Sequence, residues 1–234
     1  MKTGCNKLHI IFFIILNLTF TGCYECSTNL DTKRKINPVD HSHCLFINVL
    51  DGNQSLNIEA EGLPRVNNLR FSDSVIEYQD VFSGRNNISI SDEKKIIIYN
   101  GFIDYNRDSA STAIIYGNVN KIRLALFRDI LPECAGDCSF IRFVHLSADT
   151  PPVIFKLSNL SSTLIYRAGT EYYTVNSGNY QLNCTDTTTK ISIVPEKTLN
   201  LAAGKIYNII LNGSNTIKGS HPLNLKVIET NKSN

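Results

Sequence analysis

A histidine, a serine and an aspartate stand within five residues of one another, at His145, Ser147 and Asp149. These are the residue types of a hydrolytic triad, in which the histidine takes a proton from the serine hydroxyl. A triad is usually assembled from residues far apart in the sequence, and it needs donors that stabilise an oxyanion. One short turn cannot easily aim three side chains at one substrate. The spacing therefore favours a structural turn, in which Ser147 and Asp149 bond to turn backbone and Pro151 stiffens the chain before the next strand.

Histidines and cysteines offer two further kinds of chemistry. His41-Ser-His43-Cys44 contains zinc-ligand types but lacks a second ligand pair at the spacing of zinc modules, so we expect a linker there and no metal site. Cys134 and Cys138 are close enough in sequence to close a small disulfide loop in an oxidising compartment. Two unrelated thiols are the alternative, because other cysteines remain in the chain. No motif for a cofactor is present, and we expect none.

Cys23 follows a segment with the features of an export signal. Lys2 and Lys7 precede the apolar run Leu8–Phe20, which is short for a transmembrane helix but suits a signal peptide. Phe20-Thr-Gly-Cys23 resembles the lipobox of bacterial lipoproteins, although the motif usually has Leu in place of Phe20. The resemblance implies acylation of Cys23, with chains such as palmitate, and anchoring in the cell envelope, with the outer membrane as the expected location. Ordinary secretion of a free protein is one alternative, and a retained signal anchor is a weaker one, because Asn17 interrupts the apolar run.

Internal similarity divides the rest of the chain into two repeats. Tyr78–Ile90 and Tyr172–Cys184 share Tyr, Val and Ser-Gly at an offset of 94 residues (172 − 78). At the same offset Cys44 aligns with Cys138. We therefore predict a signal peptide over residues 1–22, a lipidated tether over 23–43, and two repeats over 44–132 and 133–234.

Each repeat has the length and the pattern of a small β-sandwich. Short alternating segments such as Lys205–Leu211 are rich in β-branched and aromatic residues, and Gly and Asn mark the turns. Ile122–Ile130 is predicted to be the last strand of the first repeat, and Lys190–Pro195 is one of eight strands expected in the second. No segment after the signal peptide has sustained helical periodicity. The predicted class is all-β, with two tandem antiparallel sandwiches.

The second repeat also contains the motif of a known family. Ile141–Val153 resembles the opening of the domain of unknown function 4397, where a strand leads into a His-x-Ser-Pro-Asp-x-Pro turn. Four residues match that turn, and we call them the signature turn: His145, Ser147, Asp149 and Pro151. Ala148 stands where the family usually has proline, and the resemblance covers most of Phe140–Thr230. It implies immunoglobulin-like sandwiches, often in tandem in exported lipoproteins, with no established activity. The first repeat has Asp51–Ser55 in place of the turn and is included only through the internal repeat.

Composition narrows the classes of function. Charged residues make up 19% of the chain, and the formal net charge is +2. The lysines and arginines are scattered along the sequence. No basic face suits nucleic acid, and no phosphate loop or nucleophile elbow is present. We therefore expect a non-catalytic envelope lipoprotein, held at the membrane through Cys23, whose sandwiches serve adhesion or bind a surface ligand such as a glycan. The alternatives are a structural subunit of an envelope assembly and, more remotely, a hydrolase that uses His145 and Asp149.

The contact surfaces are expected at the loops Asp51–Ser55 and His145–Pro152, because loops at sandwich ends are free to vary. A glycan-binding site would present aromatic rings and amide side chains together at one loop end. An assembly subunit would present an uncapped sheet edge or an apolar patch. An enzyme would present a deep polar pocket around His145.

Overall fold

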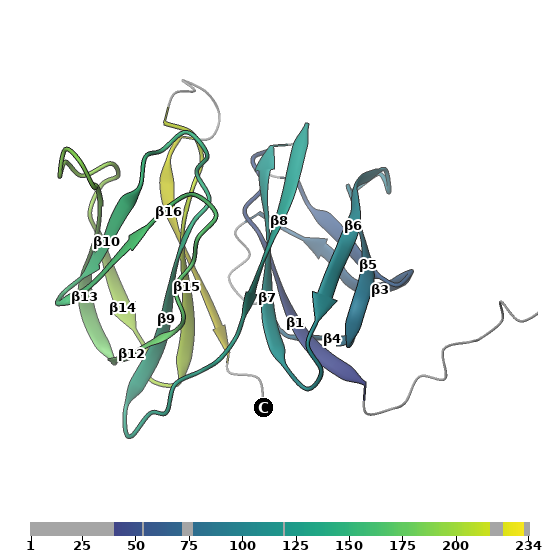
Figure 1. The fold of residues 1–234 in the computed structure, drawn as a ribbon, viewed down its shortest axis with the longest axis horizontal. Coiled ribbons are helices and arrows are strands. Elements are labelled where there is room, and N and C mark those ends of the chain that lie inside the picture. The colour runs from purple at the N-terminus through teal and green to yellow at the C-terminus, as the bar shows by residue number, and fades with distance from the viewer. Residues whose placement is uncertain (1–39, 53, 72–76, 119, 216–221, 232–234) are drawn as a thin grey trace, which may run out of the picture. The chain divides into compact units, whose positions relative to one another are not determined.

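Residues 40–52, 54–71, 77–118, 120–215 and 222–231 are described by the computed structural model in Figure 1. The predicted signal peptide and Cys23 lie outside these residues. The described part of the chain consists of strands, turns and loops without a helix, so the predicted all-β class is confirmed. Within these ranges there is accordingly no helix with the length and apolar character needed to cross a bilayer.

The first repeat folds into two four-stranded sheets that pack face to face. Its strands are β1 (His41–Asn48), β2 (Leu56–Ala60), β3 (Leu63–Leu69), β4 (Gln79–Phe82), β5 (Gly84–Ser91), β6 (Ile97–Tyr105), β7 (Ala110–Asn118) and β8 (Lys121–Arg128). One sheet has the order β4-β1-β7-β8, and the other has the order β3-β2-β5-β6. The strand predicted at Ile122–Ile130 corresponds to β8.

The second repeat has the same arrangement. Its strands are β9 (Cys138–His145), β10 (Val153–Leu157), β11 (Leu160–Leu164), β12 (Tyr173–Asn176), β13 (Gly178–Asp186), β14 (Lys197–Leu201), β15 (Lys205–Asn212) and β16 (Asn224–Asn231). The sheets have the orders β12-β9-β15-β16 and β11-β10-β13-β14. Two sandwiches in tandem, as the sequence predicts, are therefore confirmed (Figure 1).

Each sandwich departs from a purely antiparallel arrangement at one place. β1 pairs with β7 in parallel, and β9 pairs with β15 in the same way. Parallel neighbours cannot be joined by a tight hairpin. Here the chain between them forms strands of the opposite sheet before it returns. One sheet of each sandwich is therefore mixed, whereas the sequence predicts antiparallel sheets throughout.

Side-chain alternation explains why these segments form strands. In β2 the residues Leu56 and Ile58 are buried, whereas Glu59 is exposed. β9 differs, because every one of its residues is buried. Phe143 belongs to the core of the second sandwich, and its neighbour Val144 belongs to the core of the first. Strand β9 is therefore covered on both faces, as a strand between two apolar layers must be.

The core of the first sandwich is completed by the second. Four residues of the second sandwich belong to it: Val144, Leu146, Ile210 and Ile228. Ile209, beside Ile210 in β15, faces the core of the second sandwich instead. The two sandwiches thus form one compact unit, Val39–Asn234.

Strand pairing shows where the two repeats correspond. Cys44 lies opposite Gln79 of β4, and Ile141 lies opposite Tyr173 of β12. Gln79 and Tyr173 are separated by the repeat offset of 94 residues (173 − 79), so this pairing displaces β9 by three residues from the alignment of Cys44 with Cys138. Ile115 and Ile209 are also 94 residues apart (209 − 115), and they lie opposite Asn48 and Phe143, which displaces β9 by one residue. The chain between β9 and β12 is shorter than that between β1 and β4, and a constant offset does not follow such a deletion.

The strand predicted at Lys190–Pro195 is wrong. This segment follows a turn at residues 187–189, makes one bridge through Ser192, and precedes β14. The carboxylate of Asp186 accepts hydrogen bonds from the backbone N–H groups of Thr188 (2.6 Å) and Thr189 (3.1 Å), which folds the chain back. Pro195 also lacks the N–H group that a sheet ladder needs. Apolar alternation without these local bonds could not separate the segment from β14.

The tether is predicted to end at His43, but β1 already begins at His41, so the predicted tether is too long by three residues at its C-terminal end. Ser42 is fully buried, and its hydroxyl donates to the carbonyl of Ser109 at 2.6 Å. His43 Nδ1 lies 2.9 Å from the carboxylate of Asp80 in β4. The polar residues that indicate a linker in the sequence are satisfied here by the neighbouring strands.

Candidate functional site

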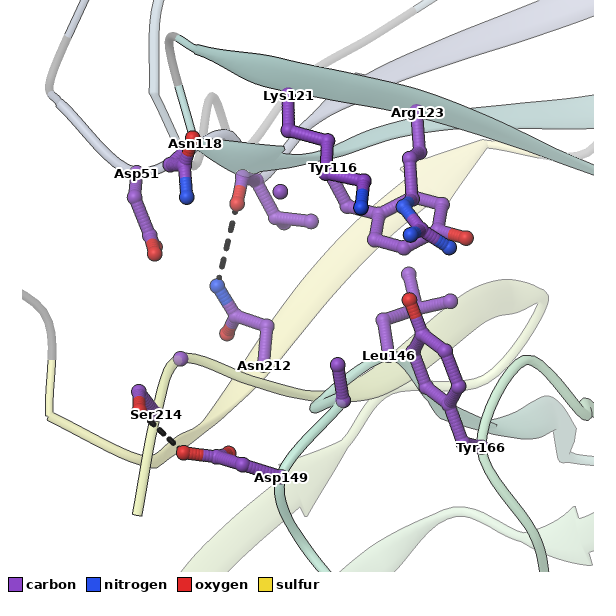
Figure 2. Close-up of a pocket in the computed structure, with 14 residues that line it drawn as sticks. Asp51, Tyr116, Asn118, Lys121, Arg123, Leu146, Asp149, Tyr166, Asn212 and Ser214 are labelled. Atoms are coloured by element: carbon purple, nitrogen blue, oxygen red, sulfur yellow. Dashed lines mark hydrogen bonds between the residues drawn. The ribbon is translucent and has the colours of Figure 1, made fainter. Parts of the chain in front are cut away.

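A cleft of about 300 Å³ lies between the two sandwiches (Figure 2). Its walls come from the loop after β1, the β7–β8 hairpin, the loops after β9 and β11, and the end of β15. This volume is at the lower end of the range for small-molecule pockets. The residues that line it are Val49, Asp51, Tyr116, Gly117, Asn118, Lys121, Arg123, Leu146, Ala148, Asp149, Tyr166, Asn212, Gly213 and Ser214.

The two loops predicted as contact surfaces meet at this cleft. Asp51 comes from the first of them, and Ala148 and Asp149 come from the second. Ala148 and Asp149 are exposed at the rim, while Asp51 is partly buried. Loops far apart in the sequence therefore share one cavity because the two sandwiches pack side by side.

His145 of the signature turn does not face solvent. Its side chain is fully buried, Nε2 lies 3.3 Å from the carbonyl of Pro151, and the ring stands edge-on to Tyr166. Burial lowers the pKa of His145. The Ser147 hydroxyl is bonded to Asp149 and to Thr150, at 3.1 and 2.5 Å. The structure therefore brings Ser147 and Asp149 into contact with each other, whereas the His145 ring contacts Pro151 and Tyr166.

Asp149 connects the signature turn to the chain after β15. Its carboxylate accepts hydrogen bonds from the hydroxyls of Ser147 and Ser214 and from the backbone N–H of Asn215 at 3.0 Å. Pro151 stands between this carboxylate and β10. The sequence predicts bonds to the backbone of the turn itself, whereas Ser147 is bonded to the side chains of Asp149 and Thr150 and the carboxylate of Asp149 also accepts bonds from a second loop.

Asn212 lies in the middle of the cleft and links the sandwiches. Its side chain is 5% exposed, and its Nδ2 donates to the carbonyl of Val49 at 3.2 Å. Its Oδ1 is buried and accepts no hydrogen bond from the described residues. Figure 2 shows the amide nitrogen on the side of that bond and the oxygen turned away from it. A buried acceptor without a donor costs about 1–3 kcal/mol, so this oxygen is suited to a ligand that donates a hydrogen bond.

The β7–β8 hairpin supplies the opposite wall of the cleft. Tyr116 and Asn118 stand on β7, and Lys121 and Arg123 stand on β8. Residues two apart in a strand share a face, which directs each pair to the same side. Gly117 has φ +102°, and a Cβ there would collide with the carbonyl oxygen of Lys121. Only glycine fits this position without strain.

Aromatic rings and cations gather at one end of the cleft. The Arg123 guanidinium lies 6.0 Å from the centre of the Tyr166 ring. Burial, together with the neighbouring Tyr166 hydroxyl, raises the pKa of Tyr116. Neither Lys121 nor Arg123 is in a salt bridge with any residue in the described ranges. Figure 2 shows both side chains reaching from β8 towards the tyrosines, with the two carboxylates at the other end.

A buried ion pair fixes the sandwiches to each other near the start of β7, whereas the cleft is at the end of that strand. Arg142 Nη1 lies 2.6 Å from Asp129 Oδ1, and both side chains are at most 2% exposed. The hydroxyls of Tyr78 and Thr112 each donate to Asp129 Oδ2 at 2.7 Å. The guanidinium also lies 3.9 Å from the centre of the Tyr172 ring. Two separate polar links thus hold the walls of the cleft in place.

The four cysteines that the structure describes are either bonded in a disulfide or buried. Cys134 and Cys138 form a disulfide at the start of β9. Cys44 and Cys184 are free and buried, and burial raises the pKa of each thiol to about 12. Both are therefore protonated near neutral pH, and a protonated thiol is a poor nucleophile.

His41-Ser-His43-Cys44 does not converge on one point. His43 faces Asp80, while Cys44 points into the core. Neighbours in a strand face opposite sides, which prevents these side chains from sharing an ion. In the part of the chain that the structure describes, no group of three or more His, Cys, Asp or Glu side chains is placed to hold a metal ion.

Sequence reasoning did not single out Lys121, Arg123 and Asn212 as site residues. Arg123 lies in the strand predicted at Ile122–Ile130 and Lys121 directly precedes it, and this spacing of two residues is the sequence signal that they share a face. No sequence signal indicates that Asn212 reaches Val49 in the other sandwich.

The family comparison matches the first repeat directly. The model of the domain of unknown function (DUF4397) matches residues 42–156, which include the signature turn and most of β10. The resemblance seen in the sequence covers most of Phe140–Thr230, whereas the family model covers the first repeat and only the start of the second. No curated protein matches the chain.

Seventeen chains of known structure match this one. Among them is the Bacillus anthracis TIE protein, at 11% sequence identity and a TM-score of 0.26. The match covers 74% of this chain and 34% of that chain, so this chain spans about a third of its length. Residues 42–156 match the model of the domain of unknown function DUF4397, which is the family that the signature turn resembles.

Proposed function

We propose that this protein is a non-catalytic, lipid-anchored envelope protein that binds a saccharide in the cleft between its sandwiches. The observation that carries the proposal is the wall of the cleft around Asn212. A buried amide oxygen without a donor stands there between tyrosines and charged side chains. This combination of amide and aromatic groups at one loop end is the one expected for a glycan-binding site.

Sugars offer both kinds of surface that such a wall needs. Their hydroxyls donate hydrogen bonds to amide and carboxylate oxygens, which Asn212, Asp51 and Asp149 provide. The C–H faces of their rings pack against aromatic side chains, as Tyr116 and Tyr166 allow. Binding costs less free energy when the residues of the site are already held in place before the ligand arrives. The links made by Arg142 and Asn212 hold the walls of this cleft in place.

A glycan panel tests the binding proposal. We expect the full-length chain, purified in detergent, to bind at least one glycan specifically. Ala148→Trp places a large ring at the exposed rim of the cleft and should abolish that binding. Ile191→Trp is the matched control, because Ile191 is 67% exposed and lies outside the cleft, and it should bind as the unaltered chain does. Absence of any specific glycan, or equal binding by the Ala148→Trp variant, would contradict the proposal.

Anchoring through Cys23 has its own test. Cells that are fed labelled palmitate should incorporate the label into the chain, and a Cys23→Ala variant should lose it. The variant should also leave the membrane fraction. Membrane retention without label would point to a retained signal segment instead.

An edge strand supports a second candidate function, that of a subunit in an envelope assembly. β6 is the outer strand of its sheet, and Ile97 and Phe102 are 61% and 58% exposed. Unpaired edges of this kind accept strands of partner proteins. Crosslinking in intact cells should capture a partner that an Ile97→Lys variant loses. A partner retained by that variant would argue against this edge.

A further inference from the structure

We propose that the saccharide is acidic, of the uronic acid class, and that Lys121 and Arg123 bind its carboxylate. This inference rests on the proposed saccharide-binding function. It assigns the ligand's charge and the end of the cleft that receives it.

The two cations are placed as an anion-binding pair. Both stand on β8 at alternate positions and both line the cleft. Arg107 and Arg142 have carboxylate partners, whereas the described residues offer none to the cleft pair. Two like charges side by side repel each other, and an anion between them removes this cost. The arrangement favours a ligand with a negative charge.

Arg123 is also oriented for a carboxylate. Its guanidinium lies over the face of the Tyr166 ring, 6.0 Å from the ring centre, and Tyr166 itself stands edge-on to the buried ring of His145. At this distance the ring attracts the cation without covering its N–H groups, and a planar carboxylate can be bound by two parallel hydrogen bonds. Tyr166 therefore favours a position of the cation at the aromatic end of the cleft.

The other end of the cleft limits how much negative charge the ligand can carry. Asp51 and Asp149 stand there, together with the unpaired oxygen of Asn212. These oxygens accept hydrogen bonds from hydroxyls but repel a second anion. A nucleotide or polyphosphate would place charge along its whole length, whereas a monosaccharide with one carboxylate satisfies both ends. The cavity of about 300 Å³ suits a ligand of that size.

Calorimetric titration with glucuronic acid and with glucose tests the inference, since the two sugars differ only in the carboxylate. With the full-length chain in detergent, we expect glucuronic acid to bind at least about tenfold more tightly, which corresponds to one charge-assisted hydrogen bond. Arg123→Gln should reduce that advantage to less than about threefold, and Lys121→Gln should reduce it partly. For each variant the affinity for glucose, which has no carboxylate, is measured alongside, and the ratio of the two affinities gives the advantage. Added salt should weaken glucuronic acid binding alone.

The control is Arg128→Gln, which removes an exposed cation from the same strand outside the cleft. It should leave both sugars unaffected. Equal affinity for the two sugars, or an unchanged advantage in Arg123→Gln, would overturn the acidic-ligand inference and leave saccharide binding in place. Failure of both sugars to bind at millimolar concentration would also overturn it. The Ala148→Trp panel experiment decides the saccharide proposal independently.

Discussion

Arg142 and Asp129 place opposite charges in nearly complete burial between the two sandwiches. Such a pair is stable only if the remaining donors and acceptors are also satisfied. Here Tyr78 and Thr112 donate to the carboxylate, and Arg142 Nε donates to the carbonyl of Thr170 at 3.1 Å. The pair therefore fixes the position of one sandwich against the other at a defined point.

Arg142→Met should be strongly destabilising, because it leaves the carboxylate of Asp129 buried without its cation. We expect a loss of about 3–5 kcal/mol in the free energy of unfolding, measured by urea denaturation. The double variant Arg142→Met/Asp129→Asn should lose less than the sum of the two single variants. A loss below about 1 kcal/mol for Arg142→Met would show that the pair contributes little.

His145 makes stability depend on pH. Its folded-state pKa is lowered by burial, so the unfolded chain binds a proton more readily. The contribution of His145 is complete above its ordinary pKa of about 6.5 and is lost as the pH falls below that value. The free energy of unfolding should decline there by at most about 1.4 kcal/mol per pH unit. A His145→Phe variant should have a shallower decline, and an unchanged slope in that variant would contradict this assignment.

At the scale of elements, the β7–β8 hairpin positions five of the residues that line the cleft. Gly117 lies between Tyr116 and Asn118 with a positive φ, opposite the backbone of Lys121. The geometry of this one residue thus decides whether the tyrosine on β7 and the cations on β8 face the same cavity.

Gly117→Ala should strain the hairpin twice, through its φ and through contact with the Lys121 carbonyl. We expect a loss of about 1–3 kcal/mol in unfolding free energy and weaker glycan binding. Gly204→Ala is the control, because Gly204 has φ +74° but a Cβ added there would have no atom within 4 Å. It should lose about 1 kcal/mol and bind normally. Thermal melts and the glycan panel measure both effects, and equal behaviour of the two variants would refute the steric argument.

Strands were predictable where alternation and turns coincide. Val153–Leu157 is predicted and observed with the same bounds, and Lys205–Leu211 corresponds to β15. Lys190–Pro195 fails because the carboxylate of Asp186 shapes the turn before it. Parallel pairing of β1 with β7 could not be predicted, since it depends on which strands become neighbours after the chain has crossed between sheets.

The candidate site was predictable only in part. The loops that contain Asp51 and Asp149 are identifiable as sandwich ends, and both line the cleft. Their meeting depends on the packing of two repeats, which is a long-range contact without a local signal. The bond from Asn212 to Val49 is of the same kind. Local patterns therefore located the loops and missed the cavity that they form.

At the scale of the whole molecule, the shared core joins the stability of the two sandwiches. Ile210 and Val144 are fully buried against residues of the first sandwich, although both belong to strands of the second. Neither sandwich can lose its fold without exposing apolar surface of the other.

The unit Val39–Asn234 should therefore unfold in a single transition in calorimetry, with equal van't Hoff and calorimetric enthalpies. Ile210→Ala should lower the unfolding free energy by about 2–5 kcal/mol and leave that single transition intact. Two resolved transitions, with only one moved by Ile210→Ala, would show that the sandwiches fold independently.

The shared core also has a consequence for how such chains can be inherited. A gene segment that encodes the first sandwich alone would encode an unfinished apolar core, since Val144, Leu146, Ile210 and Ile228 are supplied from beyond it. Recombination that cuts between the repeats would then yield a fragment with an exposed apolar surface, which is prone to aggregation. The segment that was duplicated to form the repeat is therefore smaller than the segment that can now be exchanged between genes. The two repeats should be inherited as one unit.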